Sequence, residues 1–434
     1  MHGESARTKG SRLAASVGRA GRYLGALAAL WLWAGCPSSG PGGDPGTELD
    51  LAAPTVDMAP PADLGPSRTE LYNADVTIIY PLPPASDINL MVWGNTLSSS
   101  YGRLVPLAAF SQITLPLDPR PGSRTATTGS AAWNELRLVA IRLDPCFGSR
   151  GEVPDAQCKN QVRLVFQGVH AVGNTSAAED GAIHVLYEIP RGELLTLTRE
   201  IISLTDREGG YTPGPLGVHP ILARQGVWGS FGQGLKALLR RYVGEDRAVR
   251  MTFFARLDAL QSAWRLGGFD RVGTGFQRLQ IPTTTTQEQE LLGGFPNAGE
   301  LAGSTTTPTT SSDDIRTLLS SNSARMANDA ARRAAYSAAL RIENPNKHTP
   351  DTIDCLGCHV AMATRTLGET QFGLTSTGLP DLFTTPRDLR FVAPAEPSLE
   401  NLHASSYLGT ELGVNQRTAN ETAAVATALS ALLQ

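Results

Sequence analysis

The chain has 434 residues, which is enough for two or three folded domains beyond any targeting segment. Its formal net charge is −4 at pH 7, from 37 basic and 41 acidic residues, and this balance argues against a nucleic-acid-binding protein. After residue 36 no stretch reaches the length of about 20 apolar residues that a transmembrane helix needs.

The first 36 residues predict export. A basic segment precedes a short apolar run over residues 23–34, which fits the core of a secretory signal peptide. The run ends in Ala34-Gly35-Cys36. This ending resembles the lipobox of bacterial lipoproteins, in which small residues precede a cysteine that is acylated and becomes the mature N-terminus. The resemblance implies a signal peptide at 1–35, a lipid on Cys36 and attachment to a bacterial membrane, with the outer membrane as the default.

Residues 36–67 predict a disordered tether. This segment is rich in Pro, Gly, Ser, Asp and Ala, so it has too little apolar surface to order itself. Proline-dense stretches make such a segment semi-rigid. A tether directly after Cys36 also supports the lipoprotein interpretation.

Residues 68–282 predict a β-rich, sandwich-like domain of unknown function. Short runs of apolar or alternating residues are separated by clusters of Pro, Gly, Asn and Asp, as in domains of several short strands. The predicted strands are residues 76–80, 89–93, 135–143, 161–166, 182–189 and 250–254. One helix is expected at 234–242, where apolar residues recur at helical spacing.

Two of the five cysteines lie in this region. Cys146 and Cys158 are predicted to form a disulfide, because the protein is expected to be exported. Of the other three cysteines, Cys36 is assigned to the lipid, and Cys355 and Cys358 belong to a separate motif described below. Closing such a loop stabilises a fold by roughly 2–4 kcal/mol.

Residues 283–311 predict a linker and residues 312–434 a mainly helical C-terminal domain. The linker is rich in Thr, Ser and Pro. A helix is expected from about 312 to 342, because Asp313 and Asp314 follow a serine cap and an apolar stripe follows them. A second helix is expected at 419–433.

The motif Cys355-Leu356-Gly357-Cys358-His359 lies between these two helices. Two cysteines separated by two residues and followed by a histidine form the attachment pattern for haem c. The thiols of Cys355 and Cys358 match the spacing of the two porphyrin vinyl groups, and His359 supplies the proximal iron ligand. The motif alone leaves three alternatives open, namely a small disulfide, half of a zinc site and a thioredoxin-like redox pair.

A helix, a CxxCH motif, an irregular segment and a final helix resemble a class I c-type cytochrome domain over residues 312–434. The resemblance implies that the first and last helices cross beside the haem. The entry helix is longer than the family pattern, the spacer before Cys355 is wider, and no Met occupies the usual distal position. The chain as a whole is also similar to uncharacterised predicted lipoproteins of myxobacteria, which brings no activity with it.

The family takes its sixth iron ligand from the segment between the motif and the last helix. His403 is the candidate there, so we expect bis-histidine ligation by His359 and His403. The alternatives are a five-coordinate iron or a ligand from Met326 or His348. His184 lies in an alternating strand and is interpreted as a core or surface residue rather than a ligand.

These patterns predict a lipid-anchored, exported monohaem c-type cytochrome-like protein that carries electrons to an unidentified redox partner. It is not expected to be an enzyme, although a five-coordinate iron would allow peroxidase-like chemistry. The alternative is a cell-surface or periplasmic binding or structural lipoprotein in which Cys355 and Cys358 form a disulfide.

Overall fold

The computed structural model describes residues 68–95, 98–113, 132–145, 159–256, 262–293, 313–319, 321–393 and 402–434. All of them belong to one compact unit that spans Ala62–Gln434. The predicted signal peptide and the whole of the predicted tether lie outside the described residues.

The centre of the fold is one antiparallel sheet of nine strands. Seven strands follow the order β1-β4-β5-β7-β8-β9-β10, while β6 pairs with β5 and β11 pairs with β9. The strands are β1 Thr77–Ile79, β4 Leu136–Asp144, β5 Gln161–Val172, β6 Thr175–Ala178, β7 Ala182–Glu188, β8 Ala248–Arg256, β9 Ser262–Val272, β10 Gly275–Arg278 and β11 Glu288–Gly293. The prediction of a β-rich region is therefore confirmed. The strands form one sheet rather than two facing sheets, because helices supply the layers that cover it.

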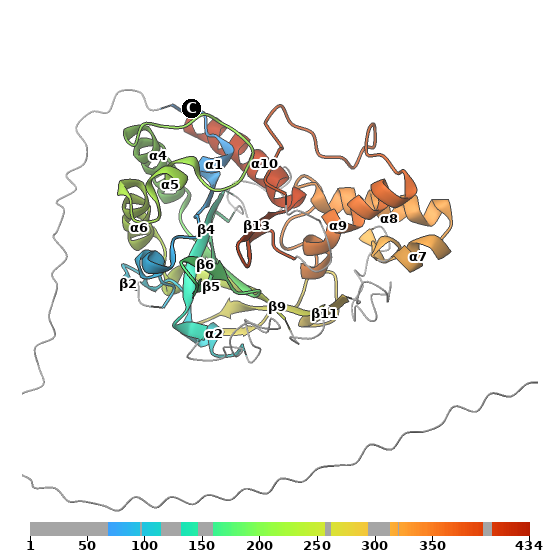
Figure 1. The fold of residues 1–434 in the computed structure, drawn as a ribbon, viewed down its shortest axis with the longest axis horizontal. Coiled ribbons are helices and arrows are strands. Elements are labelled where there is room, and N and C mark those ends of the chain that lie inside the picture. Colours follow the sequence, from blue (N-terminus) through green and yellow to red (C-terminus); the bar gives the residue numbers. More distant parts are fainter. Residues whose placement is uncertain are drawn as a thin grey trace, which may run out of the picture. The chain divides into compact units, whose positions relative to one another are not determined.

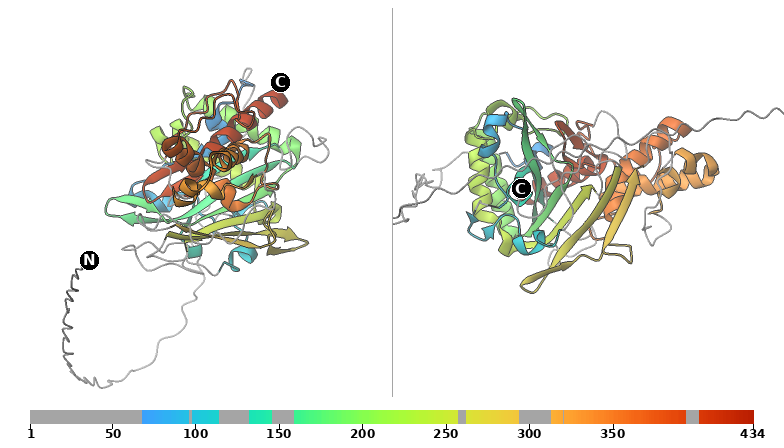
Figure 2. Two further views of the ribbon diagram at one scale, coloured as in Figure 1. Left: turned by 90° about the vertical axis from the view of Figure 1, so that its right-hand side faces the viewer. Right: turned by 60° about the horizontal axis from the view of Figure 1, so that its bottom comes forward.

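Helices lie on both sides of the sheet (Figures 1 and 2). On one side are α4 Arg191–Arg207, α5 Pro220–Gln225 and α6 Ser230–Tyr242, followed by the short η3 Glu245–Arg247. The C-terminal helices lie on the other side. Because both faces are covered, every residue of β4 is buried. The expected helix at 234–242 is confirmed within α6, and α4 was missed although its buried residues follow helical spacing.

Short elements complete the N-terminal half of the unit. They are α1 Asn73–Val76, η1 Ala85–Leu90, β2 Ser98–Ser99, β3 Gly102–Arg103 and α2 Leu107–Phe110. The strand expected at 89–93 is wrong: its first two residues end η1, and Trp93 makes only an isolated bridge to Arg137. The strand prediction did not take account of the preceding Pro-Pro-Ala-Ser-Asp sequence, which favours a tight turn of helix.

The C-terminal region consists of η5 Arg316–Leu318, α7 Ser321–Met326, α8 Asp329–Glu343, α9 Cys355–Phe372, the hairpin β12 Ser405–Leu408 and β13 Glu411–Val414, and α10 Gln416–Leu433. The helix expected at 312–342 is broken, because the Asn328 side chain accepts from Ala331 N and starts α8. The final helix is confirmed and begins three residues earlier than expected, where Asn415 caps it.

One hydrophobic core runs through the sheet and the C-terminal region. It joins sheet residues such as Ile78 and Trp264 to Val360 of α9 and Val425 of α10. A smaller cluster around Tyr336 and Leu340 fills the space between α8 and its neighbours. Part of the predicted linker also belongs to the fold, because residues 288–293 pair with β9 as β11. The polar composition that predicted the linker did not reveal this strand, which is defined by its pairing with β9.

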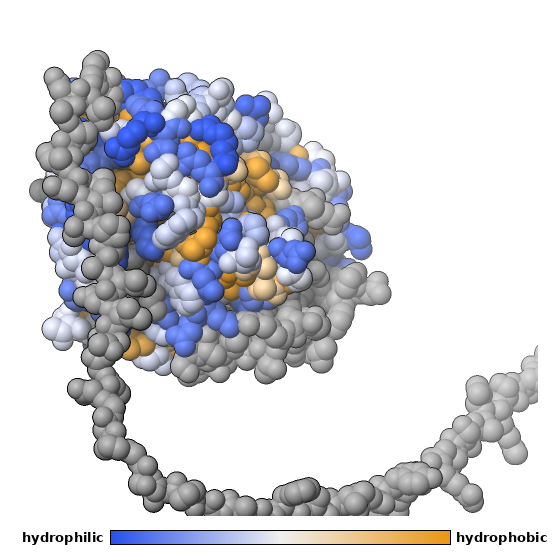
Figure 3. Space-filling model, turned by 60° about the vertical axis from the view of Figure 1, so that its left-hand side comes forward, coloured by the Kyte–Doolittle hydropathy of each residue, from blue (hydrophilic) through white to orange (hydrophobic). Residues whose placement is uncertain are grey.

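The surface is mainly hydrophilic with separate apolar areas, as the face in Figure 3 shows. The large apolar side chains with the most exposure come from different segments, namely Leu107, Val172, Trp228, Val272, Met326 and Val392. Scattered exposure of this kind is usual for a folded protein, so these six side chains do not mark a functional site.

Candidate cofactor site

The CxxCH motif forms the first turns of α9. Asp354 caps the helix, because its carboxylate accepts from the backbone N–H of Gly357 at 2.9 Å. Gln289 of β11 then ties this helix start to the sheet: its amide donates to Asp354 Oδ2 at 2.7 Å and accepts from Leu356 N at 2.9 Å. Gln289 is fully buried. The motif is therefore held on a rigid helix end that is bonded directly to the sheet.

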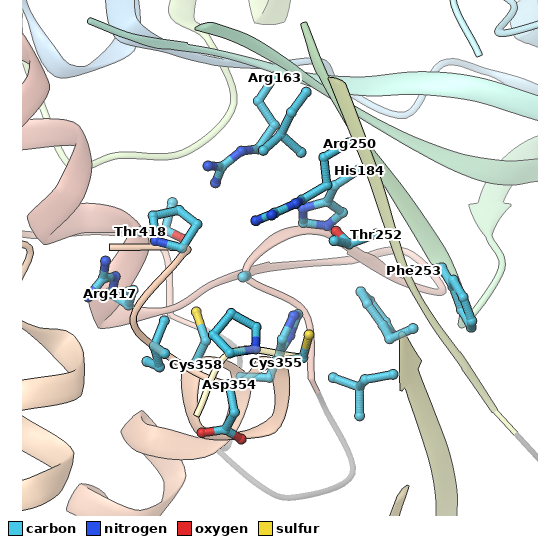
Figure 4. Close-up of a pocket in the computed structure, with 18 of the residues that line it drawn as sticks. Arg163, His184, Arg250, Thr252, Phe253, Asp354, Cys355, Cys358, Arg417 and Thr418 are labelled. Carbon is cyan, nitrogen blue, oxygen red and sulfur yellow. The ribbon is translucent and has the colours of Figure 1, made fainter. Parts of the chain in front are cut away.

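A pocket lies between this helix start and the sheet. Cys355, Cys358 and His359 line it on the helix side, and His184 lines it from β7. Figure 4 shows Arg163, His184 and Arg250 on the strands, with the two cysteines across the same space. The cavity volume that a water-sized sphere can occupy is about 110 Å³, within about 880 Å³ of space between atoms that includes open solvent. The three motif side chains thus share one cavity.

The register of the sheet sets the strand wall of the pocket. Arg142 of β4 lies opposite Arg163 of β5, and Arg163 lies opposite Leu186 of β7. Leu186 in turn lies opposite Arg250 of β8. Directly opposed residues share a face of the sheet, so one row brings three arginines to the pocket. His184, two residues before Leu186, lies on the same face in the adjacent row.

Three of the four arginines that line the pocket have protein partners. Arg142 Nη2 donates to Glu421 Oε2 at 2.9 Å. Arg250 donates from Nε to Asp270 Oδ1 at 2.5 Å and from Nη1 to Asp351 Oδ1 at 2.8 Å. Arg417 donates to the carbonyl oxygens of Ile342 and His348 at 2.6 and 2.7 Å.

Arg163 differs from the other three. Its Nε and Nη2 are buried and have no hydrogen-bond partner among the residues that the structure describes. Burial and the nearby Arg142 lower the pKa of Arg163. A buried guanidinium with unused donors is costly, and an anion in the pocket would satisfy it. The strand wall therefore suits a group that is apolar over much of its surface and carries carboxylates.

His359 is held in a defined orientation. Its Nδ1 lies 2.5 Å from the carbonyl oxygen of Leu402, so Nδ1 carries the proton and donates. This bond leaves Nε2 as the basic nitrogen, which is the arrangement of a metal-ligating imidazole. Burial lowers the pKa of His359, while the bond to Leu402 raises it. The hydrogen bond thus fixes both the tautomer and the direction of the ring.

The two motif thiols are not bonded to each other. Burial raises the pKa of Cys355 to about 12 and also raises the pKa of Cys358. A redox pair of the thioredoxin kind needs a thiol with a lowered pKa. This environment therefore disfavours the redox-pair alternative.

The segment after the last gap is fixed to the sheet. Gln167 of β5 donates to the carbonyl oxygen of Tyr407 at 2.8 Å and accepts from Tyr407 N at 2.7 Å. His403 is 2% exposed, and its Nδ1 lies 2.7 Å from Ser406 Oγ. Its ring packs against Phe254 with the centroids 5.1 Å apart. His403 is thus a buried residue beside the pocket rather than a surface residue.

The other predicted site residues fall into two groups. Met326 is 91% exposed, which argues against it as an iron ligand, and His348 Nδ1 lies 3.1 Å from the carbonyl oxygen of Thr352. Cys36, Cys146 and Cys158 lie outside the described residues, so the lipid and the disulfide remain predictions.

His184 and the arginine row were missed as site residues. The available signal was the appearance of Arg or His at alternate positions of otherwise apolar strands, as in Gln161-Val162-Arg163-Leu164. Such residues are rarely buried without a partner or a function.

Comparisons with known proteins give no family for this chain: no family model, curated protein or solved structure matches it. Among the described residues, no three His, Cys, Asp or Glu side chains gather as they would around a bare metal ion. Within the same ranges, no helix combines the length and apolar character of a membrane span.

Proposed function

We propose that the chain is a lipid-anchored, exported monohaem c-type cytochrome-like protein that transfers electrons. The observation that carries this proposal is the position of Cys355, Cys358 and His359 on the wall of one pocket whose opposite wall is the sheet. A haem of this type needs few protein ligands because the porphyrin holds the iron.

Each residue of the motif has a defined role in this proposal. The thiols of Cys355 and Cys358 would hold the haem, each by addition across one vinyl C=C bond, with sulfur bonded to one carbon and the thiol hydrogen to the other. His359 would offer Nε2 as a ligand, because its Nδ1–H donates a hydrogen bond to the carbonyl oxygen of Leu402. When bound, haem supplies a one-electron couple at the iron.

The strand wall supplies the complementary surface. Phe254 and Leu266 line the pocket with apolar groups. The unused donors of Arg163 are suited to the carboxylates of the porphyrin. In this proposal Arg163 binds the carboxylates at the edge of the haem, and Phe254 and Leu266 contact its face. Cys355 and Cys358 of α9 hold it covalently.

The N-terminal segment completes the proposal. A lipid on Cys36 would attach the chain to a bacterial membrane, with the outer membrane favoured, on the periplasmic or surface side. The tether of residues 36–67 would raise the effective concentration of the haem region near membrane-bound redox partners. The partner is expected to be a protein and not a nucleic acid.

The test is a denaturing gel of the membrane fraction, stained for haem, from cells that carry the c-type maturation machinery. Covalent haem survives denaturation, so the full-length chain should give a stained band. Cys355→Ser and Cys358→Ser together should remove the stain. The matched control, Cys146→Ser with Cys158→Ser, also removes two cysteines and should keep it.

A well-expressed, exported chain without a stained band would overturn the proposal. The chain would then be a surface or periplasmic lipoprotein whose working part lies in residues 68–282, and CxxCH would be a disulfide. A stained chain that binds CO or cyanide readily would instead have an open iron position, and peroxidase-like chemistry would be the function to assay.

A further inference from the structure

His184 and His359 face each other across the pocket from different layers of the fold. His184 comes from β7 of the sheet, and His359 comes from α9. Their ring centroids are 6.4 Å apart, with an angle of 61° between the ring planes. Both side chains line the same cavity. The histidine that the sequence analysis set aside is therefore the one whose ring is paired with the motif histidine.

This separation matches two imidazoles on one metal ion. A metal–nitrogen bond of about 2 Å and about 1.2 Å from the nitrogen to the ring centre, counted on both sides, give roughly 6.4 Å between centroids. Edge-on aromatic pairs have the same separation, as His184 and Phe254 do at 6.4 Å. The inference therefore rests on both histidines lining one cavity, with a separation that permits a shared metal ion.

His403 is not among the residues that line this cavity. Its Nδ1, like that of His359, is hydrogen-bonded: it lies 2.7 Å from Ser406 Oγ. Phe254 contacts both His403 and His359, with centroid distances of 5.1 and 5.2 Å. The same ring also contacts His184, at 6.4 Å, so the cavity lining, and not Phe254, distinguishes His184 from His403.

We propose that His184, rather than His403, is the second axial ligand of the haem iron. The inference rests on the proposed function and adds to it a ligand from the sheet, far from the cytochrome-like region in sequence. Its consequence is a six-coordinate, bis-histidine iron, which has a lower potential than a His/Met pair. Such an iron suits electron transfer and leaves no open position for substrate.

The experiment uses the purified full-length protein with its covalent haem. Wild-type protein should give low-spin ferric spectra by optical absorption and electron paramagnetic resonance. His184→Ala should convert most of the ferric haem to high spin and make the ferrous form bind CO, and added imidazole should restore the low-spin spectrum. The matched variant, His403→Ala, should keep the low-spin spectrum.

A second variant covers the case in which His184→Ala does not fold. His184→Met keeps a side chain that can ligate iron, so it should show a methionine–iron charge-transfer band and a higher reduction potential than wild type. Circular dichroism checks that each variant is folded.

The outcomes separate this inference from the proposed function. Loss of the low-spin spectrum in His403→Ala but not in His184→Ala would overturn the inference, and so would a high-spin wild-type protein. In both cases the gel would still show covalent haem and the proposed function would stand. Absence of stain in the wild-type chain would instead remove the proposed function, and the inference with it.

Discussion

Gln289 provides the sharpest test of how the sheet positions the motif, and the test is independent of haem. The substitution Gln289→Leu keeps most of the side-chain volume but removes both hydrogen bonds of the amide. It leaves the buried N–H of Leu356 without its acceptor and removes a donor from the Asp354 carboxylate. The start of α9 would then lose its direct polar connection to β11.

The size of the effect follows from burial. A buried donor left unsatisfied costs about 1–3 kcal/mol, and a hydrogen bond to a charged group contributes about 1.5–3 kcal/mol. We therefore expect the free energy of unfolding to fall by about 2.5–6 kcal/mol. Because the bond to Gln289 lowers the pKa of Asp354 against the effect of burial, the pKa of that carboxyl should also rise.

The assay is a denaturant titration of the purified chain, with the slope of the transition compared between variants. Gln280→Leu is the matched control, since Gln280 also makes two amide hydrogen bonds, at 3.0 Å each, but does so at an exposed position. It should change the free energy of unfolding by no more than about 0.5 kcal/mol. Equal effects of the two substitutions would refute the reasoning.

Two further predictions concern buried charges. Burial raises the pKa of Glu343 to about 7 despite its ion pair with Arg365, so the folded state holds this proton more tightly than the unfolded state. Stability should fall by about 3 kcal/mol as pH rises from the unfolded pKa to about 7, and unfolding titrations of Glu343→Gln should lack this slope. In the haem-free Cys355→Ser, Cys358→Ser background, Arg163→Leu should raise the free energy of unfolding by about 1–3 kcal/mol, because it removes buried donors without partners. A loss of stability in that background would show that Arg163 is already satisfied.

Much of the sheet could be predicted because local patterns decide strands. The runs at 135–143, 161–166 and 182–189 alternate or are rich in β-branched residues, and they form β4, β5 and β7. The last helix was predictable from its apolar spacing in the same way. The CxxCH motif could be found in the sequence because its spacing is short and local, while its role in haem attachment stays a prediction.

The strand wall of the pocket could not be predicted, because it depends on register. Arg142, Arg163 and Arg250 belong to strands that are far apart in sequence, with α4, α5 and α6 inserted before the third. Which residues stand opposite one another follows from the strand order, and shifting one strand by a single residue would turn its arginine to the other face. The choice of His403 likewise rested on sequence proximity to the motif rather than on its position in the fold.

The same register explains why the pocket joins the two halves of the unit. The proposed attachment points lie on α9, whereas His184 and Arg163, whose Nε and Nη2 have no partner among the described residues, lie on the sheet. A haem bound by both α9 and the sheet binds only when these two elements face each other. Its binding free energy therefore stabilises the contact between sheet and helix. Gln289 makes the same connection with two hydrogen bonds at the pocket's edge. The sheet is therefore a part of the proposed haem site in its own right, because it supplies the wall that a separate cytochrome domain would have to build from its own helices.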